Sequence, residues 1–232
     1  MKIAFLGDSI TKGHTLENES KRFSTLMCNA LGAEEQNCGS TGTLVAKAGL
    51  SKNADPLNTK SIVVKNGLSV DLKQPFVERV MDMKGADYAV VFGGTNDYYW
   101  SDTPISDCDD SESVAYFKNA VDYLCKCLLT MYPKERILFV TPYPHHGCGN
   151  YYGGESWLDP QEHDTDGRNY LGHQMLDYVD AIIEVCNRYD IECVDLYRTT
   201  TFDWKKMTTD GCHPNEAGHC WICDQLLSAK LW

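Results

Sequence analysis

The chain has 232 residues, of which 43% are hydrophobic, so it can bury one large core and we expect a single domain over residues 1–232. Its 21 Lys and Arg stand against 33 Asp and Glu, and this net charge of −12 argues against a nucleic-acid partner, which needs clustered cations. No apolar stretch approaches the roughly 20 residues of a membrane span and no signal peptide precedes the first strand, so we expect a cytoplasmic protein with no membrane partner.

The first predicted element is a buried strand over residues 2–6, which stops at the motif Gly7-Asp8-Ser9. Ligands in open α/β sheets collect at the carboxyl ends of strands, so Ser9 is a candidate nucleophile. The plain alternative is a strand-to-helix turn in which Asp8 or Ser9 caps the next helix. This motif alone does not decide between the two readings.

Strand and helix patterns alternate along the rest of the chain. We predict strands near residues 34–38, 87–92, 136–141 and 191–195, and helices near residues 20–32, 73–84, 112–131, 170–189 and 215–229. This alternation predicts the α/β class, as a three-layer αβα sandwich whose parallel five-stranded sheet has helices on both faces.

Two polar motifs follow predicted strands in the first half of the chain. Asn37-Cys38-Gly39-Ser40-Thr41-Gly42 follows the second strand, and Gly93-Gly94-Thr95-Asn96-Asp97 follows the third. The carboxyl ends of parallel strands meet at one edge of a sheet. We therefore expect both motifs to lie beside Ser9.

Three long segments, residues 48–72, 98–112 and 143–169, are predicted insertions, and loops of this length usually have a function. The last two carry aromatic residues, among them Trp100, Tyr143 and Trp157. We expect these three to form a platform on which the substrate stacks. The alternative is that the rings pack on each other or form a subunit interface, which leaves a homo-oligomer open.

The last motif is Asp210-Gly211-Cys212-His213-Pro214, which stands just ahead of the final predicted helix. Serine is a poor nucleophile at neutral pH and needs a base, which in turn needs a group to orient it. Asp210 and His213 are candidates for that pair.

Together and in this order, the four motifs resemble those of the SGNH, or GDSL, hydrolase family, and they span nearly the whole chain. The resemblance implies a flavodoxin-like sandwich and no cofactor. It makes Ser9 the nucleophile, His213 the base and Asp210 the acid that orients the base. It also implies an oxyanion hole formed by the backbone N–H groups of Ser9 and Gly42 and the side-chain amide of Asn96.

The sequence departs from the family pattern in small ways. Thr95 separates the glycine pair from Asn96, which we interpret as a tolerated variant. Gly39 and Gly42 both occur in the second motif, and counting from Asn37 favours Gly42 as the oxyanion donor, which leaves Gly39 to serve the turn. No Gly-x-Ser-x-Gly elbow occurs, which argues against the α/β-hydrolase architecture.

The expected partner is a small-molecule ester. Short acyl groups, acetyl above all, are expected because no long apolar loop run could line a deep acyl tunnel, and the aromatic loops favour a carbohydrate-like alcohol. A lysophospholipase-like or thioesterase-like member of the same family is the nearest alternative. A degenerate domain that binds a ligand without catalysis is a further one.

Eleven cysteines need a separate explanation. The odd count and the missing signal peptide favour free, mostly buried thiols in a reducing cytoplasm. The alternative is a zinc or redox protein, because Cys212, His213, His219, Cys220 and Cys223 lie close together and include a Cys-x-x-Cys spacing. We expect no metal, since the last two cysteines lie on one face of a helix where small apolar residues suffice.

Overall fold

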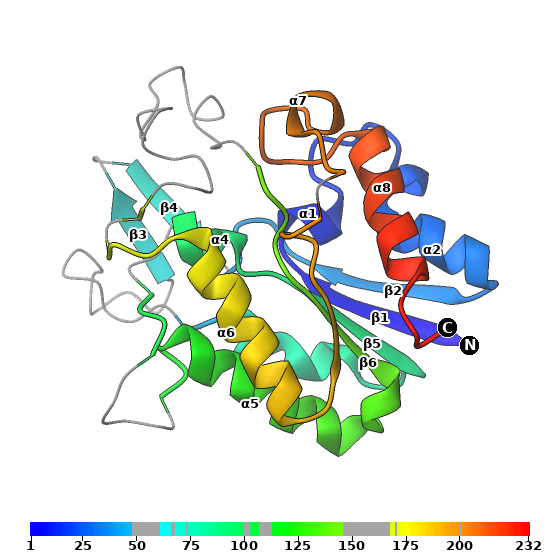
Figure 1. Cartoon of the computed structure of the whole chain (residues 1–232), viewed down its shortest axis with the longest axis horizontal. Helices are drawn as coiled ribbons and strands as arrows, with labels where there is room; N and C mark the ends of the chain where they lie inside the picture. The colour runs from blue at the N-terminus through cyan, green and yellow to red at the C-terminus, as the bar shows by residue number, and fades with distance from the viewer. Residues whose placement is uncertain are drawn as a thin grey trace.

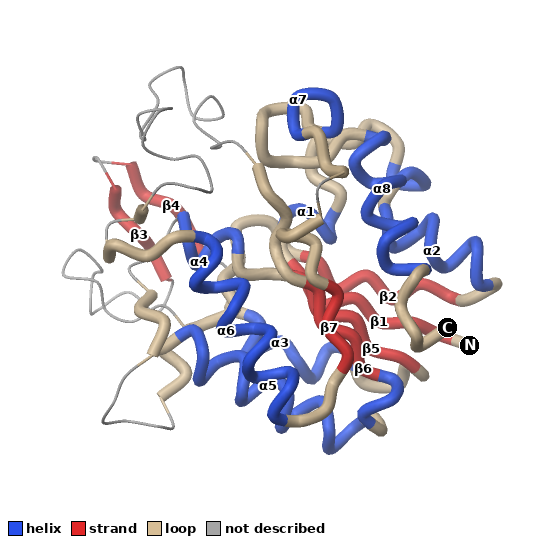
Figure 2. The backbone as a smooth tube through the Cα atoms, viewed as in Figure 1, coloured by secondary structure: helices blue, strands red, loops and turns tan. Residues whose placement is uncertain are grey.

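The computed structural model describes residues 1–47, 61–65, 68–72, 74–99, 103–106, 113–145, 168–169, 171–199 and 201–232. Five strands in this part of the chain form one parallel sheet in the order β2-β1-β5-β6-β7 (Figures 1 and 2). They are β1 (Lys2–Gly7), β2 (Glu34–Gly39), β5 (Tyr88–Phe92), β6 (Ile137–Val140) and β7 (Glu192–Val194). These are the five predicted strands, and the predicted α/β class with a five-stranded parallel sheet is confirmed.

Helices cover both faces of the sheet, with α2 and α8 on one face and α3, α5 and α6 on the other (Figure 2). The helices are α1 (Ser9–Lys12), α2 (Phe23–Leu31), α3 (Phe76–Arg79), α4 (Thr95–Tyr99), α5 (Phe117–Met131), α6 (Met175–Arg188), α7 (Trp204–Met207) and α8 (Glu216–Leu227), with 3-10 turns η1 (Glu19–Lys21), η2 (Val80–Met83) and η3 (Lys134–Arg136). Among the described residues, no helix is both long enough and apolar enough to cross a bilayer.

Strand β1 shows why the central strands are continuous apolar runs. Its side chains alternate between the two faces of the sheet, and both faces are covered. Ile3 and Phe5 belong to the core under α2 and α8, whereas Ala4 and Leu6 belong to the core under α5 and α6. All four are fully buried. The sheet is therefore a rigid support for whatever follows its carboxyl ends.

Capping residues set where the long C-terminal helices begin. Helix α6 starts with a capping box in which Gln174 accepts from the backbone of Asp177 and the Asp177 carboxylate accepts from the backbone of Gln174. It therefore begins five residues later than predicted. Asn215 caps α8 by accepting a hydrogen bond from the Gly218 N–H at 3.1 Å.

Two segments differ from the prediction. Within the predicted insertion over residues 48–72, β3 (Ser61–Lys65) and β4 (Leu68–Leu72) pair as antiparallel strands, while residues 48–60, 66 and 67 lie outside the described part. The run Ile62-Val63-Val64 favours a strand because its side chains are β-branched. The helix predicted over residues 73–84 is only the four-residue α3 followed by η2. The short helices α1, α4 and α7 escaped prediction because four or five residues do not show a full helical period.

Candidate active site

The strand order brings three of the predicted motifs to one edge of the sheet. Strand β1 lies between β2 and β5, and its last residue, Gly7, is in register with Gly39 on one side and Phe92 on the other. Ser9 begins α1 just beyond this point, and Asn96 lies in α4 just beyond β5. Ser9 and Asn96 are 87 positions apart in the sequence, but they follow neighbouring strands of the sheet and therefore lie close together.

Ser9, His213 and Asp210 form one hydrogen-bonded chain. His213 Nε2 lies 3.0 Å from Ser9 Oγ, and His213 Nδ1 lies 2.7 Å from Asp210 Oδ2. The other carboxylate oxygen, Oδ1, accepts from the backbone N–H groups of His213 at 2.7 Å and Cys212 at 3.0 Å. Asp210 therefore fixes both the ring and the backbone of the residue that faces the serine.

The carboxylate also determines which ring nitrogen carries the proton. An ionised Asp210 accepts from Nδ1–H, so Nε2 is left as the acceptor for the Ser9 hydroxyl. Burial of Asp210 opposes its ionisation, but its bonds to the His213 ring and to the backbone outweigh burial and lower its pKa to about 2. The carboxylate is therefore ionised at any neutral pH.

The turn between β1 and α1 presents Ser9. Asp8 caps α1 by accepting from the Ile10 N–H at 2.9 Å, so of the two residues considered as the cap it is Asp8 that takes this role and Ser9 that is left to face His213. Burial raises the pKa of Asp8 to about 6. A Cβ on Gly7 would lie 1.9 Å from Thr11 Oγ1, so only glycine lets α1 fold back so tightly onto the end of the strand.

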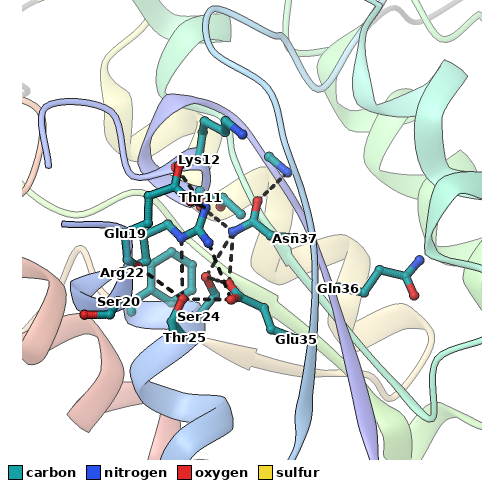
Figure 3. A network of polar contacts seen from close by, with 12 residues as sticks. Thr11, Lys12, Glu19, Ser20, Arg22, Ser24, Thr25, Glu35, Gln36 and Asn37 are labelled. Atoms are coloured by element: carbon teal, nitrogen blue, oxygen red, sulfur yellow. Dashed lines mark hydrogen bonds and ion pairs between the residues drawn. The ribbon is translucent and has the colours of Figure 1, made fainter. Parts of the chain in front are cut away.

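The second motif holds α1 from the side of β2 (Figure 3). Asn37 Nδ2 donates to the Thr11 carbonyl oxygen at 2.8 Å, and Asn37 Oδ1 accepts from the Gly39 N–H at 2.9 Å. A Cβ on Gly39 would lie 2.5 Å from the backbone nitrogen of Lys12. Gly39 thus allows close packing of the strand end against α1, and Gly42 remains the candidate donor.

The predicted oxyanion donors lie in the loop after β2 and in α4. Gly42 has a φ of +75°, which glycine adopts without strain. Asn96 is buried, and its Nδ2 donates to the carbonyl oxygen of Thr43 at 2.9 Å, so the amide is fixed beside the residue that follows Gly42. The next residue, Asp97, accepts from the N–H groups of Val45 and Ala46, which holds the same loop.

His14 is a site residue that the sequence analysis missed. Its ring lies edge-on to the His213 ring with centroids 4.9 Å apart, and its backbone N–H donates to the Ser9 carbonyl oxygen. Burial first, then the neighbouring His213, lower its pKa. No motif includes this position, and only the packing of the loop after α1 brings the ring there.

The predicted aromatic platform is wrong for Tyr143. Its ring is 1% exposed and packs against Phe202 with centroids 4.5 Å apart, so no substrate can stack on it. Its hydroxyl donates to the Cys212 carbonyl oxygen at 2.6 Å and therefore supports the loop that carries His213. Trp100 and Trp157 lie outside the described residues.

The histidines and cysteines considered for a zinc site do not come together in the structure, because they make separate contacts. His213 faces Ser9 and Asp210, while His219 Nδ1 accepts from the Phe23 N–H at 3.2 Å. Cys220 is exposed, whereas Cys223 is buried in the core between α8 and the sheet. Over the described ranges, no three His, Cys, Asp or Glu side chains are grouped closely enough to hold a metal ion.

Comparisons with known proteins identify the fold and the family. Similar solved structures include a protein from Lactobacillus plantarum (24% identity, TM-score 0.73, covering 98% of this chain and 94% of that one) and a possible lipase from Chitinophaga pinensis DSM 2588 (17%, 0.66, 97% and 95%). The acetyl xylan esterase AlAXEase is a further one (16%, 0.57, 99% and 100%). No curated protein sequence matches significantly. Residues 5–220 match the model of the GDSL-like Lipase/Acylhydrolase family. The chain therefore belongs to the GDSL-like Lipase/Acylhydrolase family.

Proposed function

We propose that this member of the family is a serine esterase that hydrolyses short-chain esters through an acyl-enzyme intermediate. The observation that carries the proposal is the hydrogen-bonded chain from Asp210 through His213 to Ser9, with contacts of 2.7 and 3.0 Å. A serine becomes an effective nucleophile when an oriented base accepts its proton. All three side chains stand at the carboxyl edge of a parallel sheet, where such folds bind ligands.

In the proposed mechanism, His213 Nε2 takes the proton of Ser9 as Oγ attacks the ester carbonyl carbon. The carbonyl oxygen becomes an oxyanion, and its donors would be the N–H groups of Ser9 and Gly42 and the Asn96 amide, each worth about 3 kcal/mol in enzymes where one was removed. The bond to the alcohol then breaks, and His213 returns the proton to the leaving oxygen. Water attacks the acyl-enzyme in the same way, with His213 again as base, and releases the acid and Ser9.

The acyl group we propose is acetyl or another short chain. The support is that no long apolar run occurs in the loops of the sequence, and a deep acyl tunnel would need such a lining. The proposed alcohol is carbohydrate-like, because Trp100 and Trp157 fall in loops that follow strands at the edge carrying Ser9. A neighbour with the same fold is an acetyl xylan esterase.

A panel of p-nitrophenyl esters tests the acyl preference. We expect kcat/KM to be highest for the acetate and to fall toward the octanoate, with Ser9→Ala inactive on every ester. A clear preference for octanoate would favour the lysophospholipase-like or thioesterase-like alternative instead. Turnover of all esters at the same rate by wild type and Ser9→Ala would refute an esterase centred on Ser9.

The alcohol preference is tested with Trp100→Ala and Trp157→Ala. We expect each change to raise KM for an acetylated sugar more than KM for p-nitrophenyl acetate, whose small alcohol does not reach a stacking surface. Equal effects on the two substrates would indicate that these rings do not bind the sugar. In that case the subunit-interface reading of the loops becomes the better one, and the oligomeric state of the two variants would change.

The cytoplasm is the proposed compartment. Cys28, Cys125, Cys186 and Cys223 are buried free thiols, which a reducing environment preserves. Burial raises the pKa of Cys223 to about 11, so this thiol is protonated and unreactive at neutral pH. Activity should accordingly be the same with and without a thiol reductant, and a chelator should not change it. Loss of activity and folding on removal of bound zinc would contradict this.

A further inference from the structure

Arg79, the last residue of α3, is a buried cation that no motif of the sequence includes. It is 9% exposed, and its guanidinium donates four hydrogen bonds. The acceptors are the carbonyl oxygens of Gln74 (2.9 Å), Cys38 (2.7 Å) and Gly7 (3.2 Å) and the hydroxyl oxygen of Thr43 (3.1 Å). One side chain therefore joins the carboxyl ends of β1 and β2 to the loop that contains Gly42.

All four acceptors are uncharged. Burial lowers the pKa of Arg79, but a guanidinium ordinarily titrates above about pH 12 and so stays charged. The charges of Asp82 and Asp8 oppose this shift, yet the four groups that accept hydrogen bonds from the guanidinium are neutral, and burying a cation in this way is costly compared with pairing it directly or replacing it with an apolar side chain. The cost makes Arg79 a poor choice for simple core packing and favours a role for its charge or its fixed fork of donors.

Thr43 connects Arg79 to the candidate oxyanion donors. Its hydroxyl accepts from Arg79 and donates to the Ser40 carbonyl oxygen at 2.8 Å, while its own carbonyl oxygen accepts from Asn96 Nδ2 at 2.9 Å. Thr43 directly follows Gly42. Its carbonyl group therefore holds the Asn96 amide, and its backbone is joined directly to Gly42.

We propose that Arg79 is a positioning residue for the oxyanion hole: through Thr43 it holds the Gly42 and Asn96 donors, and through Gly7 it holds them relative to Ser9. This inference rests on the proposed esterase function. Donors stabilise an oxyanion best when they are fixed before the charge develops, because no energy is then spent on reorienting them. The buried positive charge of Arg79, which contacts this loop at Thr43, would also stabilise the negative charge of the oxyanion.

Arg79→Gln is the first test, with p-nitrophenyl acetate as substrate. We expect kcat to fall at least about tenfold while KM stays within about threefold, since the lost interaction matters only as the oxyanion forms. The rate of Ser9 labelling by a fluorophosphonate should fall in parallel. Arg136→Gln is the charge control, because Arg136 is exposed, directly precedes β6 and stacks on Tyr88 at the start of β5, at the end of the strands opposite the site. Its kcat should equal that of wild type.

A second pair of variants keeps Arg79 and changes the hydroxyl that it contacts in the loop, which also donates to the Ser40 carbonyl oxygen. Thr43→Val retains the shape of the side chain without the hydroxyl and should lower kcat severalfold, whereas Thr43→Ser retains the hydroxyl and should restore it. The double variant Arg79→Gln with Thr43→Val should lose no more kcat than the more damaging single change. Thr43→Val and Thr43→Ser therefore test the role of the contact between Arg79 and Thr43 even if Arg79→Gln does not fold.

The results separate this inference from the proposed function. Inactive wild type, or turnover by Ser9→Ala, would defeat the esterase proposal itself. Serine-dependent turnover with normal kcat in folded Arg79→Gln or in Thr43→Val would overturn only the role of Arg79. Equal kcat losses in Thr43→Val and Thr43→Ser, or losses that multiply in the double variant, would also overturn it, because Arg79 would then not act through the Thr43 hydroxyl.

Discussion

The hydroxyl of Tyr143 donates to the backbone carbonyl oxygen of Cys212 at 2.6 Å, one residue before His213. Tyr143 follows β6 by three residues, and its ring also meets the Phe92 ring at the end of β5, edge-on with centroids 6.3 Å apart. The loop that carries the histidine is therefore attached to the carboxyl edge of the sheet by a buried side chain. Asp210 also stabilises this loop, because its carboxylate accepts from the backbone N–H groups of Cys212 and His213.

Tyr143→Phe should weaken this attachment. The variant leaves the Cys212 carbonyl without its donor in the interior, which costs about 1–3 kcal/mol of unfolding free energy. We expect kcat for p-nitrophenyl acetate to fall severalfold with little change in KM, as His213 is held less firmly. Urea unfolding and steady-state kinetics measure the two effects. If KM for an acetylated sugar rises instead and kcat is unchanged, the ring contacts substrate after all.

Gly39→Ala should be strongly destabilising. The new Cβ would stand 2.5 Å from the Lys12 nitrogen, a backbone atom that can move only if α1 moves. Overpacking of this kind costs about 1–3 kcal/mol, and a shifted α1 would also displace Ser9 and lower kcat. Gly32→Ala is the matched control: nothing lies within 4 Å of the new Cβ, so only the strain of a φ of +62° remains. It should lose some stability but keep wild-type kcat.

Equal kcat in the two glycine variants would contradict the assigned role of Gly39. This pair also shows which part of the second motif could be predicted. Counting from Asn37 predicts that Gly39 serves the turn, and it makes Gly42 the candidate oxyanion donor. The reason for glycine at position 39, a backbone-to-backbone approach with residues 27 positions earlier, exists only in the folded chain.

His219 should make the protein sensitive to mild acid. Its ring is buried beside Phe23, and burial, followed by the charges of Arg22 and His213, lowers its pKa to about 3 from an ordinary value of 6.5. Between these two pH values the unfolded chain binds a proton that the folded chain does not, so stability falls as pH drops from 6.5 toward 3. At about 1.4 kcal/mol per pKa unit, the shift from 6.5 to about 3 corresponds to a full loss on the order of 5 kcal/mol.

His219→Asn tests this, because the amide oxygen can still accept from the Phe23 N–H without titrating. Buried Asp8 and Asp97, whose pKa values burial raises to about 6 and about 7, act in the opposite direction, since they favour folding more as pH falls. The difference between wild type and variant is therefore the informative quantity. Urea unfolding between pH 7.5 and 4.5 should show wild type losing stability relative to the variant. Parallel curves would contradict the low pKa of His219.

The strands and the main site residues could be predicted because each has a local signature. Central parallel strands are continuous apolar runs, and polar motifs directly after them mark the edge where ligands bind. Ser9 and His213 are 204 positions apart, yet both are recognisable from the residues next to them.

Other residues have no such signature. An aromatic ring such as Tyr143 has the same sequence appearance whether it binds a ligand or fills the interior, and only the fold decides. Arg79 occupies a short helix, where an arginine ordinarily faces solvent. Its role depends on three chain segments that meet only after folding.

The most direct test of the proposed esterase mechanism is to locate the nucleophile. Wild-type protein is treated with a fluorophosphonate and digested, and mass spectrometry maps the adduct. We expect one adduct per chain, on the peptide that contains Ser9, with loss of ester hydrolysis in proportion to labelling. Folded Ser9→Ala should show neither adduct nor turnover. An adduct on a different serine, or wild-type turnover by folded Ser9→Ala, would contradict the assignment of Ser9 as the nucleophile.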